Sequence, residues 1–152
     1  MAGEQGAEPH DMPGPVHVEV PALARPGGHY SHAAVGGGLV FISGQLPVTP
    51  DGERLADASF EAQVAQTLAN VQAALLAAGS GVDKLLQVRV YLDDIANWPA
   101  FDRIYAQWAG PSRPARAVVP TGPLHFGFKV EVEAMALEKA SQRTSTAHER
   151  EE

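Results

Sequence analysis

Hydrophobic residues along this chain recur with two different periods. Between residues 60 and 78 they return every three or four positions, as on one face of a helix. We predict that this helix is capped by Asp57 or Ser59 and that it ends at Gly79, because glycine tolerates the backbone of a C-terminal cap. Four polar residues on the opposite face are predicted to contact solvent: Glu61, Gln63, Gln66 and Asn70.

The other elements follow from similar patterns. Residues from Trp98 to Trp108 repeat the helical spacing, and Gly110 with Pro111 ends this second helix. Alternating apolar and polar residues predict strands at 30–35, 39–43, 85–92, 117–119 and 128–137. Glycines 36–38 favour a hairpin between the first two strands. The alternation at 16–20 fits either an edge strand or no regular structure.

This order of elements predicts an α+β fold: one mixed β-sheet with two helices packed on one face. The two helices leave the second face of the sheet uncovered. We therefore expect that face to pack against partner subunits through cyclic self-association.

Length and composition indicate a single domain. The 152 residues, 45% of them hydrophobic, suit one core, which we place at residues 15–140. The N-terminal segment 1–14 is rich in glycine, proline and glutamate, and the C-terminal segment 141–152 is almost entirely polar. Both segments are predicted to be disordered tails, because they cannot bury enough apolar surface.

The formal charge of −7 comes mostly from the two ends of the chain. Residues 25–137 hold ten acidic and eight basic side chains, a charge of only −2. Without a basic stripe, nucleic acid is a poor ligand. The absence of cysteine excludes disulfides and thiolate chemistry. No signal peptide or membrane-spanning apolar run is evident, so we expect a cytoplasmic protein with no membrane partner.

Candidate chemistry lies near the C-terminal end of the domain. Arg116 follows Pro114 where a strand is predicted to begin, and its guanidinium could bind a small carboxylate through two parallel hydrogen bonds. Glu131 could return to the same pocket on a neighbouring strand and handle a proton or a water. The alternative is a strand-edge arginine with solvent-facing glutamates, which is the commoner role of charged residues.

Several motifs between Gly28 and Leu137 together resemble the Rid family of imine deaminases, also called YjgF-type proteins. They are Gly28-His29-Tyr30-Ser31-His32-Ala33, Val40-Phe41-Ile42-Ser43-Gly44-Gln45-Leu46-Pro47, the helix from Gln63 to Gly79, Val88-Arg89-Val90-Tyr91-Leu92, Pro114-Ala115-Arg116 and Val130-Glu131-Val132-Glu133-Ala134. The resemblance implies a chorismate-mutase-like fold and a homotrimer whose active sites lie between subunits.

The resemblance also implies roles for individual residues. Arg116 and the backbone N–H of Val118 are expected to bind the substrate carboxylate, and Glu131 is expected to orient or activate the attacking water. Three further residues are expected to line the same cleft, the first of them from an adjacent subunit: Tyr30, Ser43 and Gly44.

The implied reaction is hydrolysis of a reactive 2-imino acid, such as 2-iminobutanoate or 2-iminopropanoate, or of its 2-enamino tautomer. The products are a 2-oxo acid and ammonia, and the reaction removes a damaging intermediate without a metal or organic cofactor. Two alternatives stay open. One is a pathway-specific enzyme or ligand-binding trimer for a larger molecule. The other is an endoribonuclease that inhibits translation, which the charge distribution disfavours.

Some residues depart from the usual pattern of the family. His29 and His32 flank Tyr30, and we expect both at the surface, on opposite faces of a strand. The segment Thr121–Phe128 is bulkier and more aromatic than a small pocket requires, and it could change the shape of the cleft. Asp102 lies on the second predicted helix, where a solvent-exposed acid without a role is the simplest interpretation.

Overall fold

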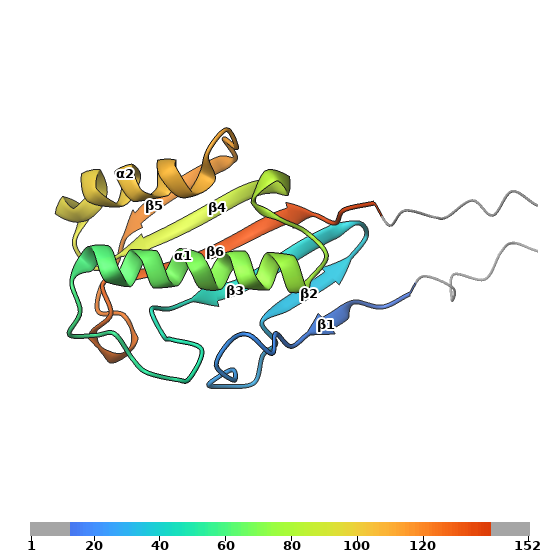
Figure 1. Ribbon diagram of the computed structural model, residues 1–152, viewed down its shortest axis with the longest axis horizontal. Coiled ribbons are helices and arrows are strands. Elements are labelled where there is room, and N and C mark those ends of the chain that lie inside the picture. Colours follow the sequence, from blue (N-terminus) through green and yellow to red (C-terminus); the bar gives the residue numbers. More distant parts are fainter. Residues whose placement is uncertain (1–12, 141–152) are drawn as a thin grey trace, which may run out of the picture.

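Six strands form one sheet in the computed structural model, which describes residues 13–140 (Figure 1). In spatial order the strands are β1 (Val16–Val18), β2 (Ala33–Gly36), β3 (Leu39–Gln45), β6 (Val130–Leu137), β4 (Leu85–Leu92) and β5 (Ala115–Pro120). β4 and β5 run parallel, and the other neighbouring strands are antiparallel. The tails predicted at residues 1–14 and 141–152 lie outside the described residues, except for residues 13 and 14, which precede β1 without regular structure.

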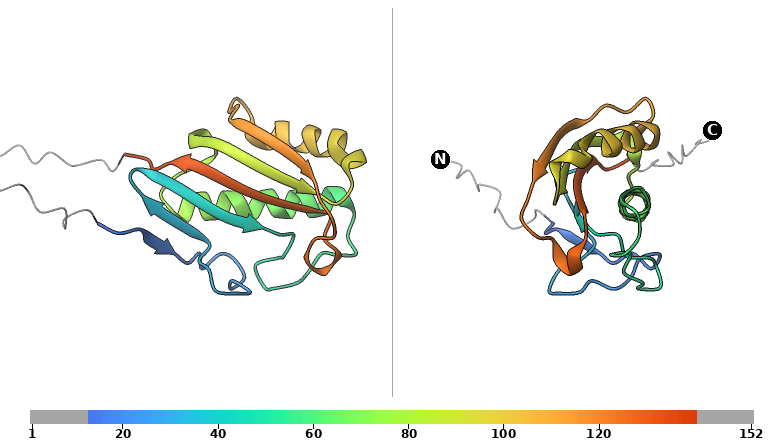
Figure 2. Two further views of the ribbon diagram at one scale, coloured as in Figure 1. Left: turned by 180° about the vertical axis from the view of Figure 1, so that it is seen from behind. Right: turned by 90° about the vertical axis from the view of Figure 1, so that its left-hand side faces the viewer.

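Two helices, α1 (Phe60–Ala77) and α2 (Trp98–Ala109), lie on the same side of the sheet (Figure 2). The Ser59 hydroxyl accepts a hydrogen bond of 3.1 Å from the N–H of Ala62, so Ser59 is the cap of α1. The helix stops before Gly79, whose φ is +79°. This arrangement confirms the predicted α+β fold. Of the helices in residues 13–140, none is long and apolar enough to cross a membrane.

Several strand boundaries differ from the prediction. β2 begins at Ala33 rather than at residue 30, and β6 begins at Val130 rather than at 128, after a short 3-10 turn, η3 (His125–Gly127). Two other 3-10 turns precede β4 and α2: η1 (Val82–Lys84) and η2 (Ile95–Asn97). The open interpretation of residues 16–20 is settled by β1, a short edge strand that pairs with β2.

Alternate residues of the central strands point toward the helices and form the core. Side chains of β4 and β6 pack against the apolar face of α1, and both sets are fully buried. They include Val88, Val90, Val130 and Val132 on the strands, and Val64, Val71 and Leu75 on the helix. Each buried aliphatic side chain contributes roughly 1.5–3 kcal/mol. This packing holds in place the strands that carry the candidate site residues.

The polar face of α1 is not entirely exposed, contrary to the prediction. Gln63 is fully buried. Its amide nitrogen donates to the carbonyl oxygens of Ala56 (3.2 Å) and Ala58 (3.1 Å), and its amide oxygen accepts a bond of 3.0 Å from the N–H of Lys129. Gln63 therefore ties the segment before β6 to the loop before α1, and it is buried because that loop folds over it.

Asn70, also predicted to contact solvent, is buried as well. Its amide nitrogen donates to the carbonyl oxygens of Leu46 (3.0 Å) and Val48 (2.9 Å), and its amide oxygen accepts from Gln66 at 2.8 Å. These bonds satisfy backbone groups of the loop that follows β3. The loop is therefore held against α1.

The second face of the sheet is not covered by any element of the described chain, as the view from behind shows (Figure 2). Along β6 the buried residues Val130 and Val132 alternate with Glu131 and Glu133, which point to this open face. Large apolar side chains remain 38–44% exposed on the edges and middle of the sheet: Phe41, Val119 and Leu137.

Candidate functional site

Glu131 lies on the open face of the sheet against Gly44. The register between β3 and β6 shifts between Ile42 and Gln45, which places Gly44 in a bulge. A Cβ atom built on Gly44 would collide with Oε1 of Glu131. A side chain at this position would displace the Glu131 carboxylate, so glycine is favoured here by a close approach and not by its φ angle.

Burial raises the pKa of the Glu131 carboxyl group above its ordinary value. The nearby His125 opposes this increase in the pKa, and Glu133 adds to it. A carboxylate that is desolvated in this way is a stronger base than an ordinary glutamate. It is therefore better suited to take a proton from water near neutral pH.

Glu133, two residues along the same strand, has partners that Glu131 lacks. Its carboxylate accepts a hydrogen bond from the Tyr91 hydroxyl and lies 3.7 Å from the Arg89 guanidinium. The bond to Glu133 raises the pKa of Tyr91. Of the two acids in the Glu-x-Glu motif, only Glu131 is therefore free of such partners among the described residues, which distinguishes it as the candidate base.

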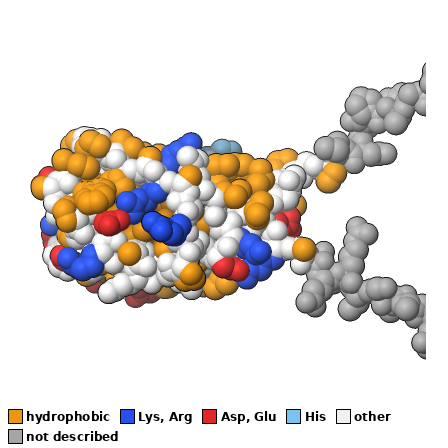
Figure 3. Space-filling view, turned by 90° about the horizontal axis from the view of Figure 1, so that it is seen from above, with side chains coloured by type: hydrophobic (Ala, Val, Ile, Leu, Met, Phe, Trp, Pro, Cys, Tyr) orange, Lys and Arg blue, Asp and Glu red, His pale blue; other side chains and the backbone are white. Residues whose placement is uncertain are grey.

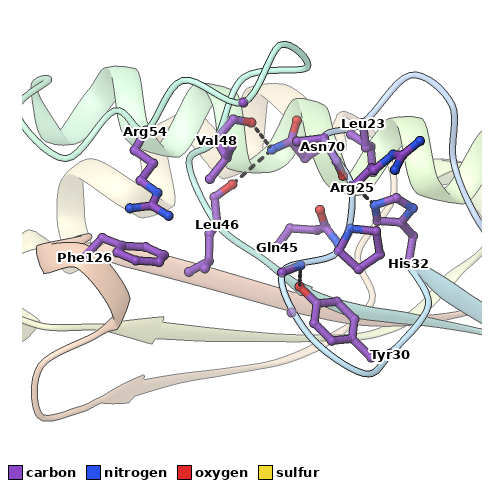
Figure 4. Close-up of a pocket in the computed structure, with 15 residues that line it drawn as sticks. Leu23, Arg25, Tyr30, His32, Gln45, Leu46, Val48, Arg54, Asn70 and Phe126 are labelled. Atoms are coloured by element: carbon purple, nitrogen blue, oxygen red, sulfur yellow. Dashed lines mark hydrogen bonds between the residues drawn. The ribbon is translucent and has the colours of Figure 1, made fainter.

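Ser43 and Tyr30, two of the predicted site residues, lie beside Glu131's contact Gly44. The Ser43 hydroxyl donates to the carbonyl oxygen of Ser31 at 2.6 Å, and this bond fixes the loop before β2 against β3. Tyr30 is 52% exposed, and its hydroxyl accepts a bond of 3.3 Å from the N–H of Gly27. Tyr30 and Gly44 both line a cleft of about 390 Å³ (Figure 4).

His32 was expected at the surface, but it is only 5% exposed. Its Nδ1 accepts from the N–H of Val20 (2.8 Å), so its Nε2 carries the proton that is donated to the carbonyl oxygen of Ala24 (2.8 Å). The prediction failed because residues 28–32 form a loop rather than a strand. His32 holds the preceding segment in place, whereas His29 is exposed.

Arg116 and Val118 point to the other face of the sheet. In the parallel pairing of β4 and β5, Arg116 lies beside Val88 and Val118 lies beside Val90, both of which face the helices. Within one chain, the structure therefore does not bring Arg116 and Glu131 together. The expectation that they share a pocket on neighbouring strands is wrong for a single subunit, because the pairing puts them on opposite faces.

Asp102, for which no role was expected, is the partner of Arg116. Its Oδ1 lies 2.8 Å from Nη1 of Arg116, and the guanidinium lies over the ring of Tyr105, 4.8 Å from the ring centre. The Arg116 side chain keeps 22% of its surface exposed. Seen from above, the surface of the molecule has basic and acidic side chains next to each other among apolar ones (Figure 3).

Helical spacing alone could have placed Asp102 on the same face of α2 as Tyr105, three residues further along, but it could not have indicated that Asp102 pairs with Arg116. His125 was missed because it belongs to an irregular segment without a period. Among residues 13–140, no three histidine or acidic side chains come together to hold a metal ion.

Comparison with known proteins agrees with these motifs and this fold. A family profile described as Endoribonuclease L-PSP matches residues 11–138. Protein HMF1 of Saccharomyces cerevisiae is 36% identical over 110 residues, which cover 72% of this chain and 84% of HMF1. The chain belongs to the Rid (YjgF-type) family. The resemblance found in its sequence is thereby confirmed.

Solved structures of Rid family members have the same fold. The Rid family protein YyfA of Yersinia pestis is 32% identical, with a TM-score of 0.78 over 82% of this chain and 99% of YyfA. TdcF of E. coli, whose structure contains bound serine, is 29% identical, with a TM-score of 0.76 over 81% of this chain and 98% of TdcF. A ligand with an amino-acid backbone thus binds to one relative.

Proposed function

We propose that this Rid family protein is a hydrolase that converts reactive 2-imino or 2-enamino acids into 2-oxo acids and ammonia. The observation that carries this proposal is the environment of Glu131. Its carboxylate is desolvated, has a raised pKa and lies against Gly44 at the edge of an open cleft. The serine bound to TdcF also supports a substrate with the backbone of an amino acid.

The site is completed by a second subunit in this proposal. Arg116 lies on β5 at one edge of the sheet, and Glu131 lies on the face that no described element covers. A homotrimer with head-to-tail contacts can place the β5 edge of one subunit against the open face of the next, and three such contacts close a ring. Each ring would then contain three sites between subunits.

Arg116 fixes the substrate in this arrangement. Its planar guanidinium binds both oxygens of the 2-carboxylate, and the backbone N–H of Val118 on the same strand donates a further bond. Tyr30 and Ser43 of the neighbouring subunit line the opposite wall. Holding the imine carbon about 3 Å from a fixed water supplies much of the acceleration, because the reaction no longer waits for a chance encounter.

Glu131 then serves as the general base. The substrate reacts as its protonated iminium form, so Glu131 takes one proton from water as the water oxygen bonds to C2 and the electron pair of the C=N bond moves onto nitrogen. Glu131 then returns this proton to the amino group of the carbinolamine. The C–N bond breaks as the hydroxyl group gives its proton to Glu131 and the C=O bond forms, and the released ammonia takes up that proton as ammonium. One water is consumed for each ammonia released, and no oxidant is needed.

Ribonuclease activity is the second candidate, because the matching family profile is described as an endoribonuclease. The charge of −2 on residues 25–137 does not favour phosphate contacts. The third candidate is a pathway-specific enzyme, or a ligand-binding trimer, that acts on a larger molecule. A cytoplasmic location stays a prediction.

One assay separates these candidates. A threonine dehydratase generates 2-aminoacrylate from serine and 2-aminocrotonate from threonine in the presence of semicarbazide, which traps the imine. The proposed hydrolase should divert most of the imine from the trap to the 2-oxo acid. An unchanged yield of trapped imine, together with cleavage of single-stranded RNA, would instead support the ribonuclease.

A further inference from the structure

The cleft that is lined in part by Gly44, the residue that Glu131 contacts, is also lined by two arginines and by no acidic residue. Arg25 and Arg54 are the charged groups of its lining, and uncharged residues such as Tyr30 and Gln45 make up most of the rest. This positive lining contrasts with the formal charge of −7 on the whole chain. An anionic ligand is therefore attracted to this cleft in particular.

Arg54 lies over an aromatic ring at one end of the cleft. Its guanidinium carbon lies 3.5 Å from the centre of the Phe126 ring, and the two side chains face each other in Figure 4. A guanidinium that lies over a ring is attracted by the electrons of its face. The N–H groups along the guanidinium edge are then left to donate to a ligand in the plane of the group.

The backbone conformation of Phe126 determines where its ring points. Phe126 has φ of +57°, in the left-handed region that aromatic residues rarely adopt. Its ring is held edge-on by the fully buried Phe128, at 5.7 Å between ring centres. Phe126 nevertheless remains 54% exposed, so the strained backbone presents the ring to the cleft rather than to the core.

Arg54 has no carboxylate partner within residues 13–140. The ion pairs found in that part of the chain join Arg89 to Glu133, Arg116 to Asp102 and Lys139 to Asp83. Arg54 therefore differs from Arg116, whose charge is already balanced by an acid. A preformed cation with unused donors is what a second anionic group of a ligand requires.

We propose that Arg54, positioned by Phe126, binds a carboxylate on the side chain of the substrate. The preferred substrates are then 2-imino acids with an acidic side chain, such as the imine of aspartate or glutamate. This inference rests on the proposed function, in which Arg116 of the adjacent subunit holds the 2-carboxylate. The size of the cleft agrees, since 390 Å³ lies in the range of sites for ligands larger than 2-aminoacrylate.

Competing turnover of two imines tests this subsite. Amino-acid oxidases generate 2-iminosuccinate from aspartate and 2-iminopropanoate from alanine, with catalase present and semicarbazide as the trap. The wild-type protein should have a kcat/KM roughly tenfold higher for 2-iminosuccinate, because a hydrogen-bonded ion pair to Arg54 contributes about that factor. Arg54→Gln should remove the preference while hydrolysis of 2-iminopropanoate stays within about twofold.

Two further variants serve as controls. Arg103→Gln removes the same charge from an exposed position of α2 that does not line the cleft, and it should leave both rates unchanged. Phe126→Leu keeps Arg54 but removes the aromatic face, and it should lower the preference for 2-iminosuccinate. An equal preference for the two imines in the wild type, or equal losses for both in Arg54→Gln, would overturn the subsite and leave the deaminase proposal intact.

Binding gives a readout that does not need turnover. By calorimetry, 2-oxoglutarate, which has two carboxylates, should bind more tightly than 2-oxobutanoate, and Arg54→Gln should weaken only the former. If neither imine is hydrolysed but this selective loss is seen, the proposed function is wrong and the anion subsite stands. If neither imine is hydrolysed and both oxo acids bind equally, both proposals are wrong.

Discussion

Charged residues on the two faces of the sheet have opposite environments. On the helix-covered side, Arg116 is already neutralised by Asp102 and lies over Tyr105. On the open side, Glu131 is partly desolvated, with a raised pKa and a close contact to Gly44 but no ion pair among residues 13–140. The proposed binding group is therefore stabilised and the proposed base is destabilised, and in the proposed site a second subunit brings the two together.

The largest expected effect is that of Glu131→Gln. The amide keeps the shape of the side chain but cannot accept the proton from water, so kcat should fall by roughly 10²–10⁴-fold, the usual contribution of a general base. Binding of 2-oxobutanoate, which depends on Arg116, should persist. Steady-state kinetics on 2-aminocrotonate and calorimetry measure the two effects, and an unchanged kcat would reduce Glu131 to a structural residue.

Arg116→Lys tests whether Arg116 fixes the orientation of the substrate carboxylate or supplies only a positive charge. A lysine keeps the positive charge but cannot fix the plane of the carboxylate, and a misplacement of about 1 Å can cost about a hundredfold in rate. The variant should therefore be nearly as inactive as Arg116→Ala while remaining folded by circular dichroism. Turnover close to that of the wild type would show that alignment by this residue is not needed.

Mixing the two inactive variants tests whether the two faces meet between subunits. In a ring of three, every mixed trimer of Arg116→Ala and Glu131→Gln chains has one junction where both native residues meet. Random exchange after refolding should therefore restore about a quarter of the wild-type activity. No recovery, or a monomer in sedimentation, would mean that the two residues do not form a shared site.

Asp102 should have a smaller effect, and its two substitutions should differ. Asp102→Asn keeps an oxygen for the contact with Arg116 but removes the negative charge that competes with the substrate, so KM should fall by about twofold to fivefold with little change in kcat. Asp102→Ala removes the positioning contact and should lower kcat/KM instead. Identical kinetics for both variants would exclude a role for Asp102 in orienting Arg116.

The smallest expected effect is on stability. Because burial raises the folded-state pKa of Glu131, the folded protein is more stable when this carboxyl group is protonated. The stability that this carboxyl group contributes is fully present below its unfolded pKa, about 4.3, and is lost as the pH rises through the higher folded pKa. Glu131→Gln should therefore melt at a higher temperature than the wild type at pH 7, and this difference should disappear below about pH 4. A wild type that is the more stable protein at pH 7 would contradict this.

The same raised pKa has a consequence for catalysis. The base must be ionised to act, so kcat/KM of the wild type should fall on acidification at a higher pH than an ordinary glutamate would cause. The pH profile of 2-aminocrotonate hydrolysis measures this. A profile that is flat down to the pKa of an ordinary glutamate would show that burial does not tune Glu131.

The sequence was sufficient for the order of the elements. Periodicity places apolar residues on one face of a helix or strand, and short-range signals such as Ser59 and Gly79 mark where α1 begins and ends. It was also sufficient to recognise the Rid family, whose motifs single out Arg116 and Glu131 as candidate site residues. These features depend on residues that are close along the chain or on recognisable combinations of them.

Only the tertiary structure decided how those residues are partnered. Gln63, Asn70 and His32 are buried because irregular loops, which have no period, fold over them. The pairing of Asp102 with Arg116 and the placement of Arg116 and Glu131 on opposite faces follow from the register of β4 with β5 and β6. Register between strands distant in sequence is set by packing of the whole sheet, so the pattern of a single strand cannot reveal it.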